Sequence, residues 1–428
     1  MHKWGVVVLA AIALAASSGR VLAQTGLFPT ELTPPERESV MQRARPDYAP
    51  VGGRVGDFFL YPSAEAEGYW DSNVFYAPHA KSDFYASLRP AFSALSDWGT
   101  NQLNFLANAE VRRFATEVSE NQTNYNLATN GRLDILHGEY LEGGMGFQNQ
   151  HEERYAASSA PTQVHPTEYQ EASGRLKFVR ERGIVGVQLN GGLDYYTYDN
   201  TLTTSGASLR ETDRNRIEVY GGPKVTYEII PDYHAFIAGA LNDRIYQSTF
   251  DVNGLKRSSH GGEVDVGTDV EITRLITGEI FVGYLRQEYD DSRLPTISSP
   301  GFGGNLLWNV TEATSIRAKA SRTIQEVDLF GTTAAGTVTS ALQTAVGASI
   351  EHEVLRNVLL TGGASFTSDD YQGTSRTDNT VEGDLGLSYL LNRMWSTGLD
   401  VSYQNRTSNT SGVSYSRALI GAKIRLQY

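Results

Sequence analysis

Arg417–Tyr428, the last stretch of the chain, has the sequence RALIGAKIRLQY, and it decides the fold. One face of this stretch carries Ala418, Ile420, Ala422, Ile424, Leu426 and Tyr428, and the other carries Arg417, Gly421, Lys423, Arg425 and Gln427. Leu419 is the one exception. Because successive side chains of a strand point to opposite sides, a period of two indicates a β-strand with one apolar face.

The same alternation runs through stretches further upstream. Trp395–Tyr403, Val381–Tyr389 and Val264–Ile272 place apolar side chains opposite polar or acidic ones. A soluble sandwich or propeller would pack the apolar faces against a second sheet. A transmembrane barrel would instead turn them to lipid and fill its lumen with polar groups. Alternation alone does not choose between these folds.

The lengths of the links between the strands favour the transmembrane barrel over the soluble folds. Tight links alternate with long polar ones, as in outer-membrane barrels with short periplasmic turns and longer external loops. The tight links lie near Ser96–Thr100, His137–Glu139, Glu181–Ile184, Ile230–His234, Thr273–Gly278, Asn309–Ala313, Val354–Asn357 and Leu391–Met394, and the long ones include Ala156–Pro166, Asn200–Glu211 and Ser368–Asp378. Tiling residues 57–428 in this way predicts an all-β, transmembrane, antiparallel up-and-down β-barrel of about 18 strands, with 16 as the alternative.

A barrel in lipid must also be closed, because no backbone amide can stay unpaired in hydrocarbon. The first strand, near Asp57–Trp70, should therefore pair with the last, near Val413–Tyr428. Tyrosines gather towards the long loops, and Trp98, Trp308 and Trp395 lie near the tight links, as two interfacial girdles require. The terminal aromatic residue is similar to the signal read by the outer-membrane assembly machinery. That machinery, outer-membrane lipid and lipopolysaccharide are the expected partners.

The start of the chain predicts export. A basic Met1–Lys3 precedes the apolar run Trp4–Ala16, and Val21–Ala23 suits signal-peptidase cleavage. The expected organisation is a cleaved signal peptide over 1–23, a periplasmic leader or partial plug over 24–56, and an outer-membrane barrel over 57–428. The alternatives are an N-terminal anchor for the first segment and a disordered leader for the second. Past residue 24 no apolar run approaches the length of a membrane-spanning helix.

Charge and cysteine content exclude several classes of protein. Removing residues 1–23 takes away Lys3 and Arg20 and no acid, so 36 basic and 49 acidic side chains become 34 and 49, a net charge of −15. Nucleic acid is not an expected partner, because its binding rewards basic patches. With no cysteine, the exported chain has no disulfide staples.

Short motifs in the chain resemble a family of bacterial β-barrel porins. These are Arg45-Pro46-Asp47-Tyr48, Gly56-Asp57-Phe58-Phe59, Asp71-Ser72-Asn73-Val74-Phe75, Asn392-Arg393, Gly398-Leu399, Tyr403 and Asn405-Arg406. The resemblance spans most of the mature chain and implies a barrel. Members often accompany exopolysaccharide or capsule biosynthesis, so the resemblance suggests polysaccharide export. Ser72 stands where a second acidic residue is usual, and Tyr428 stands where phenylalanine is commoner.

No residue pattern predicts catalysis, a metal site or a cofactor. His151 with Ser158 and Ser159 matches no defensible triad spacing. The pairs Asp290-Asp291 and Asp369-Asp370 lack the regular oxygen ladder of a calcium loop, and we interpret them as polar loop residues. The glycine-rich stretches lie in strands rather than in a phosphate loop.

The candidate functional residues are those that parity directs into the lumen. They are Arg89, Arg112, Arg132, Glu263, Asp265, Asp269, Glu271, Arg317, Lys319, Glu382, Asp384, Asp400, Arg417, Lys423 and Arg425. Acids and bases cluster on different strands. One interpretation is a transverse field that acts on a solute in a water-filled pore. The other is that these charges only satisfy one another inside a polar interior.

The resemblance and the polar lumen together favour an outer-membrane channel of a Gram-negative bacterium. The leading hypothesis is a passive conduit for exopolysaccharide export that docks to periplasmic polysaccharide-export components. A general or small-solute diffusion porin is the first alternative, and it should show an infolded constriction loop. A non-transporting structural or surface barrel is the second, and it should tolerate loss of its lumen charges.

Overall fold

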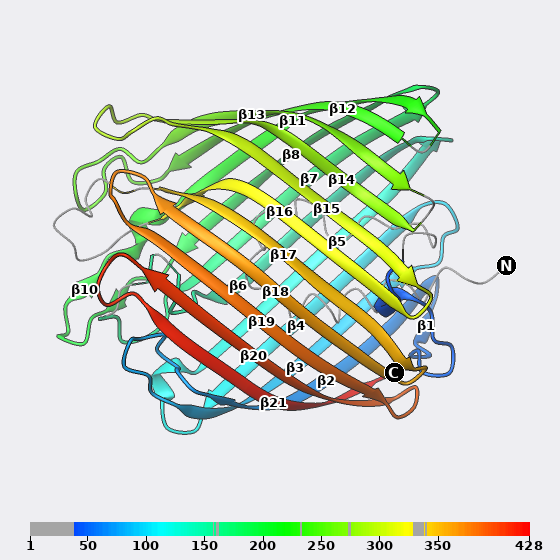
Figure 1. The fold of residues 1–428 in the computed structure, drawn as a ribbon, viewed down its shortest axis with the longest axis horizontal. Coiled ribbons are helices and arrows are strands. Elements are labelled where there is room, and N and C mark those ends of the chain that lie inside the picture. The colour runs from blue at the N-terminus through cyan, green and yellow to red at the C-terminus, as the bar shows by residue number, and fades with distance from the viewer. Residues whose placement is uncertain are drawn as a thin grey trace.

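The computed structural model describes residues 38–428 apart from 157, 160–161, 232, 273–274, 328–337 and 339. Within this part of the chain, 18 antiparallel strands form a closed barrel (Figure 1). The architecture and the strand number predicted from the alternation and the links are confirmed. The predicted signal peptide, 1–23, and leader residues 24–37 lie outside the described residues.

The wall follows chain order, each strand pairing with the next. Its first half comprises β2 (Phe58–Asp71), β3 (Asp83–Ser96), β4 (Gln102–Phe114), β5 (Gln122–Leu136), β6 (Glu139–His151), β7 (Glu168–Arg182), β8 (Val185–Tyr198), β11 (Arg216–Ile230) and β12 (Tyr233–Tyr246). Its second half comprises β13 (Ser259–Ile272), β14 (Ile276–Tyr289), β15 (Ile297–Thr311), β16 (Thr314–Glu326), β17 (Ser340–Leu355), β18 (Val358–Tyr371), β19 (Thr377–Leu390), β20 (Trp395–Ser408) and β21 (Tyr415–Gln427).

The barrel closes between β2 and β21, as the pairing argument predicts. The antiparallel register runs from Ser63 opposite Gln427 to Asp71 opposite Leu419. A short strand, β1 (Gly53–Val55), pairs only with the start of β2. The strand edges are thus satisfied by the chain itself, as hydrocarbon surroundings require.

The two faces of the wall follow the sequence alternation. On β21, Ile420 and Ile424 are exposed on the outer face, whereas Arg417 is buried on the inner face. Leu419, the exception in the pattern, packs with Val74 and Tyr85 in a small apolar cluster on the inner side. The alternation therefore predicts whether a side chain lies on the inner or the outer face of the wall. Local packing explains why Leu419, an apolar residue, lies on the inner face.

Short turns gather at one end of the barrel and longer links at the other, on the right and left of Figure 1. The longer links carry a two-stranded hairpin and two short 3₁₀ helices: β9 (Thr201–Leu202), β10 (Ser208–Leu209), η3 (Val118–Glu120) and η4 (Glu211–Arg214). The link expected over Ser368–Asp378 is shorter than predicted, because Asp369 and Asp370 still pair with β19. No helix in the described residues is long and apolar enough to cross a membrane.

Candidate functional site

The lumen is narrowed at the short-turn end by the segment that precedes the barrel. Its 3₁₀ helix η2 (Val40–Gln42) is completed by a capping box, in which the Ser39 backbone N–H donates to Gln42 Oε1 at 3.0 Å. The backbone N–H of Val40 donates to Ser315 Oγ at 2.8 Å, and that of Met41 donates to Glu351 Oε2 at 2.9 Å. Wall side chains thus bind the orphan amides of this short helix.

The same segment is anchored far from the strand that follows it. Arg45 Nη2 lies 2.7 Å from Glu353 Oε2 on β17 and donates to the Val40 carbonyl at 2.9 Å. In the wall, β18 to β21 separate β17 from β2. Residues 38–56 therefore pass from β15–β17 back to β2 at the short-turn mouth. The prediction for residues 24–56 was a periplasmic leader or a partial plug. The contacts of residues 38–56 fit a partial plug, and we keep this assignment as a proposal.

At the long-loop end, the link between β6 and β7 folds into the lumen. The Tyr155 carbonyl accepts a hydrogen bond from Arg406 Nη1 of β20 at 2.7 Å. Five wall strands, β21 and β2 to β5, separate β20 from β6. Glu153 Oε1 lies 3.5 Å from Arg112 Nη1 of β4. This infolded loop, residues 152–156, crosses part of the lumen instead of projecting outward.

Ion pairs hold the infolded loop from several sides. Arg154 Nη2 lies 2.5 Å from Glu120 Oε1 in η3. Glu152 pairs with Arg214 of η4. The Tyr155 ring centroid lies 5.2 Å from that of Tyr76 in the β2–β3 link. Because both partners of the first two pairs are largely buried, the loop is positioned by contacts that solvent screens weakly.

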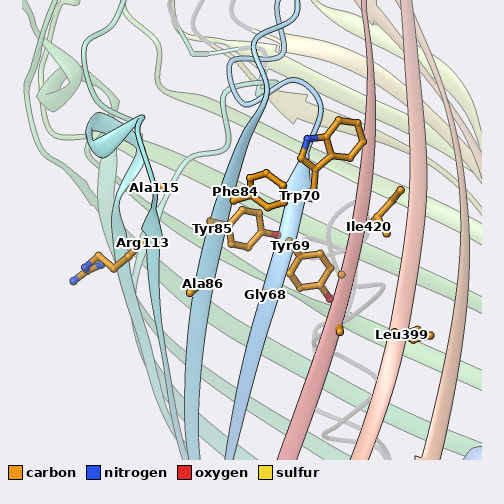
Figure 2. A pocket seen from close by; sticks show the side chains of 12 residues that line it. Gly68, Tyr69, Trp70, Phe84, Tyr85, Ala86, Arg113, Ala115, Leu399 and Ile420 are labelled. Atoms are coloured by element: carbon orange, nitrogen blue, oxygen red, sulfur yellow. The ribbon is translucent and has the colours of Figure 1, made fainter.

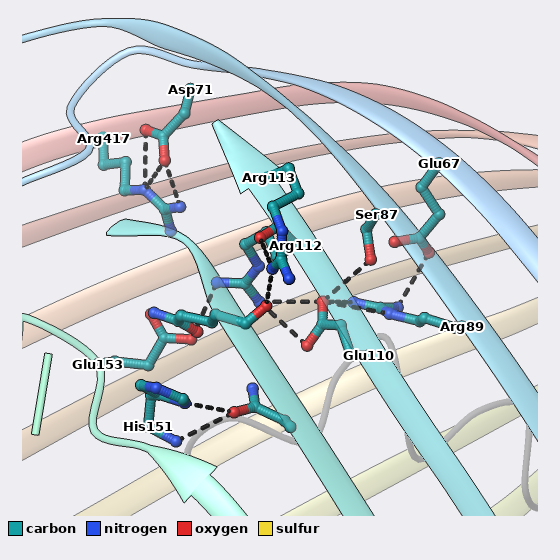
Figure 3. Close-up of polar contacts among 12 residues, drawn as sticks. Glu67, Asp71, Ser87, Arg89, Glu110, Arg112, Arg113, His151, Glu153 and Arg417 are labelled. Atoms are coloured by element: carbon teal, nitrogen blue, oxygen red, sulfur yellow. Dashed lines mark hydrogen bonds and ion pairs between the residues drawn. The ribbon is translucent and has the colours of Figure 1, made fainter. Parts of the chain in front are cut away.

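Two predicted lumen residues, Arg89 and Arg112, belong to one network of charges (Figure 3). Arg89 lies 2.9 Å from both Glu67 of β2 and Glu110 of β4. Arg112 lies 3.1 Å from Glu110 and also reaches Glu153 of the infolded loop. The network links the wall to the constriction, so these charges satisfy one another while they border the pore.

Most of the other predicted basic residues also have polar partners. These contacts are Arg132–Asp134 at 2.9 Å, Arg317–Glu351 at 3.4 Å, Arg417–Asp71 at 2.6 Å, Lys423–Asp400 at 2.8 Å and Arg425–Ser63 at 3.3 Å. Asp269 lies 3.2 Å from Lys224, a lumen base that the sequence analysis did not select. Acids and bases therefore neutralise one another, in most of these pairs between different strands, which weakens the expected transverse field.

The remaining predicted residues lie on the inner-face positions of β13, β16 and β19. They are Glu263, Asp265, Glu271, Lys319, Glu382 and Asp384. Asp265 lies against Gly283 of β14, where an added Cβ would come within 1.9 Å of its carboxylate oxygen. Gly363 of β18 makes room for Asp384 in the same way, since a Cβ there would lie 2.4 Å from Oδ1. Glycine thus lets these carboxylates lie flat along the wall. A role of any of them towards a solute stays a proposal.

Sequence reasoning missed the residues that narrow the lumen. Glu153 and Tyr155 lie in a loop, where no strand period exists to assign a direction. Arg406 could have been found, because it shares the parity of Asp400 on β20. It borders a cavity of about 210 Å³ beside the infolded loop, together with Gln343, Asp369 and Tyr371.

The outer face of the barrel has a hollow of its own at the β2–β21 seam, of about 720 Å³. Figure 2 shows Trp70, Phe84, Ile420 and Leu399 around Gly68, with Arg113 to one side. The lining is largely apolar, so this hollow suits hydrocarbon and not a polar solute. Among the described residues, no group of three or more His, Asp or Glu is placed to hold a metal ion.

The family comparison agrees with a barrel. The family model described as "Putative beta-barrel porin 2" matches residues 45–428. None of the curated proteins matches the chain. Similar solved structures include a ferric enterobactin receptor (PfeA) mutant from Pseudomonas aeruginosa, with 7% identity, a TM-score of 0.48, and 86% of this chain and 80% of that one covered. The siderophore receptor PirA from Acinetobacter baumannii has 6% identity, a TM-score of 0.46 and the same coverage. OpdK from Pseudomonas aeruginosa has 11% identity, a TM-score of 0.44, and 86% and 99% covered.

Proposed function

The chain belongs to the family described as "Putative beta-barrel porin 2", and from this premise we propose that it is a passive diffusion channel for small hydrophilic solutes. Such a barrel lies in the outer membrane of a Gram-negative bacterium, with its short turns in the periplasm and its long links outside. A barrel of 18 strands encloses enough space for an aqueous channel. The polar inner face provides a path that a hydrated solute can follow.

The position of the infolded loop in the lumen is the observation that favours a small solute over a polymer. Glu153 contacts Arg112 of β4 and Tyr155 contacts Arg406 of β20, and three wall strands lie between β4 and β20. A loop held in this position limits the size of what can pass. The leading hypothesis from the sequence, exopolysaccharide export, would require a polymer to pass both this loop and residues 38–45. We therefore favour the small-solute alternative, and export stays a prediction.

Single-channel recording in a planar lipid bilayer tests this function. The purified protein should give discrete openings without a partner. Replacing residues 153–156 by glycine and serine should raise the conductance, because it removes the groups that narrow the pore. Shortening the exposed β20–β21 link over 409–413 serves as the control and should leave the conductance unchanged. No openings, or equal effects of the two changes, would contradict the proposal.

A deletion strain separates diffusion from export. Loss of extracellular polysaccharide, with accumulation in the periplasm, would favour export and the expected periplasmic export components. Unchanged polymer with reduced uptake of small solutes would support the porin. The exposed apolar band and the seam hollow are the surfaces that we propose for lipid and lipopolysaccharide. The terminal Tyr428, exposed on the outer face, is the residue proposed for contact with the assembly machinery.

A further inference from the structure

One buried arginine in the lumen differs from its neighbours in its partners. Arg406 is 7% exposed. Its Nε donates to Thr380 Oγ1 at 3.1 Å and its Nη1 donates to the Tyr155 carbonyl at 2.7 Å. Within the described part of the chain, no carboxylate lies within ion-pair distance of the guanidinium, and Asp369 and Asp378 act on it only at longer range. Its carbon Cζ lies 5.4 Å from the ring centroid of Tyr415. Burial of a charge is costly unless the charge is paired, so an anion in direct contact with this guanidinium would stabilise it further.

Four other largely buried arginines near the long-loop end have a carboxylate close by. The pairs are Arg417–Asp71, Arg376–Asp378, Arg214–Glu211 and Arg216–Glu218, with separations of 2.5–2.9 Å. At each of these four positions the chain itself supplies the counter-ion. Arg406 instead holds the infolded loop through the Tyr155 carbonyl, and it borders the same open space as Arg214 and Arg216.

The open space is the cavity beside the loop. Its volume of about 210 Å³ corresponds to about seven water molecules at about 30 Å³ each, which suits a single sugar ring. Gln343, Asp369 and Tyr371 border it on the side of Arg406, and Tyr155 borders it from the infolded loop. Gln343 Nε2 donates to Asp369 Oδ1 at 2.8 Å, which orients both polar groups.

We propose that this cavity is a selectivity site for a small hydroxylated carboxylate, of the class of the sugar acids; the inference rests on the proposed diffusion function. The solute carboxylate pairs with Arg406, whose planar guanidinium matches its geometry. Asp369 accepts hydrogen bonds from hydroxyl groups but repels a bare anion, so it favours a hydroxylated acid over acetate. The ring of Tyr155 supplies an apolar face for a sugar ring.

Calorimetric titration of the detergent-purified full chain tests the site with glucuronate, glucose and acetate. Glucuronate should bind at least about 10-fold more tightly than either of the others. Glucose lacks the carboxylate that pairs with Arg406, and acetate lacks the hydroxyl groups that donate to Asp369. Arg406→Gln should weaken glucuronate binding about 10-fold or more. Arg286→Gln is the matched control: this arginine is exposed on β14, and its loss should leave binding unchanged.

Two results would overturn the site. One is glucose or acetate binding as tightly as glucuronate to the unaltered protein, and the other is equal glucuronate binding by the protein and its Arg406→Gln variant. If that variant does not fold, Arg406→Lys replaces it and should still weaken binding, since an ammonium group lacks the planar two-point contact. The titration needs no ion flow. A protein that binds glucuronate but conducts no ions would refute the proposed channel and leave the binding site supported. A protein that conducts ions but does not bind glucuronate would refute only the binding site.

Discussion

Asp71 and Arg417 form a two-point ion pair across the junction of β2 and β21, where the first strand of the wall meets the last. Arg417 Nε lies 3.0 Å from Asp71 Oδ1 and Nη2 lies 2.6 Å from Oδ2, with both side chains buried. Next to this pair, Asn73 Nδ2 donates to the Ser416 carbonyl at 3.0 Å, and Ser72 Oγ accepts from the Ala418 N–H at 2.7 Å. The motif that carries the family resemblance therefore joins the ends of the barrel.

Breaking this pair should destabilise barrel closure. Asp71→Asn leaves a buried guanidinium without its counter-ion, a loss of about 3–5 kcal/mol. The measurement is the temperature at which the folded band converts to the unfolded band on an SDS gel, which should fall. The double variant Asp71→Leu/Arg417→Met should be less destabilised than either single change, since no lone charge remains. The exposed pair Arg286–Glu288 provides the control, where Arg286→Gln should cost no more than about 1 kcal/mol. A double variant as unstable as the singles would contradict this account.

Weakening the dock of residues 38–45 should widen the short-turn mouth. Glu351→Gln removes the charge that accepts the Met41 N–H, and Glu353→Gln removes the ion pair with Arg45. Each contact involves a charged group and contributes about 1.5–3 kcal/mol. The double variant should show higher single-channel conductance and more open-channel noise than the unaltered protein. Unchanged conductance would mean that this segment does not limit ion flow.

Period-two alternation and link length predicted most of the wall. The strand expected near Asp57–Trp70 is β2 at Phe58–Asp71, and that near Val413–Tyr428 is β21 at Tyr415–Gln427. Both cues are local, because each depends on neighbours in sequence and on the need to bury one face. This is why they located strands to within a few residues without any knowledge of long-range contacts.

The constriction could not be predicted in the same way. Tyr155 meets Arg406 across 251 positions of sequence, and a loop residue has no parity to indicate its direction. The polar stretch beginning at Ala156 was interpreted as an external loop. A polar sequence does not distinguish a loop outside the barrel from a loop in the water-filled lumen. Pairing within the lumen was also hidden, since Lys224 and Asp269 lie on strands that are not neighbours.

Removing a lumen base should shift ion selectivity. Lys224 Nζ lies 3.2 Å from Asp269 and 2.5 Å from Glu279, so Lys224→Gln leaves two lumen carboxylates uncompensated. A unit charge changes the energy of a passing monovalent ion by about 1 kcal/mol at roughly 4 Å in water. The reversal potential in a salt gradient should move towards cation preference at about 0.1 M salt and much less at about 1 M, where screening is shorter. Arg286→Gln, on the outer face, should not move it. An equal shift at both salt concentrations would argue against a direct effect of this charge.

Acid should loosen the external link that Asp291 organises. Its carboxylate accepts from Arg293 Nε at 2.8 Å and Nη2 at 2.6 Å, and from the backbone N–H groups of Lys256 and Arg293 at 3.0 and 3.1 Å. The Arg293 side chain first, and then these backbone donors, hold the pKa of Asp291 well below its usual range. Because the folded pKa lies below the unfolded value of about 4, the stabilisation is present above that value and is lost as the pH falls towards the folded pKa.

Hydrogen-exchange protection of the Lys256 and Arg293 amides measures this effect. Protection should be high at neutral pH and should fall in acid, and Asp291→Asn should lower it at neutral pH already. The variant should then show little further loss in acid, because its amide does not titrate. Protection at the β2–β21 seam, far from this link in the wall, is the internal reference. If the unaltered protein and the variant lost the same protection on acidification, another group would be responsible.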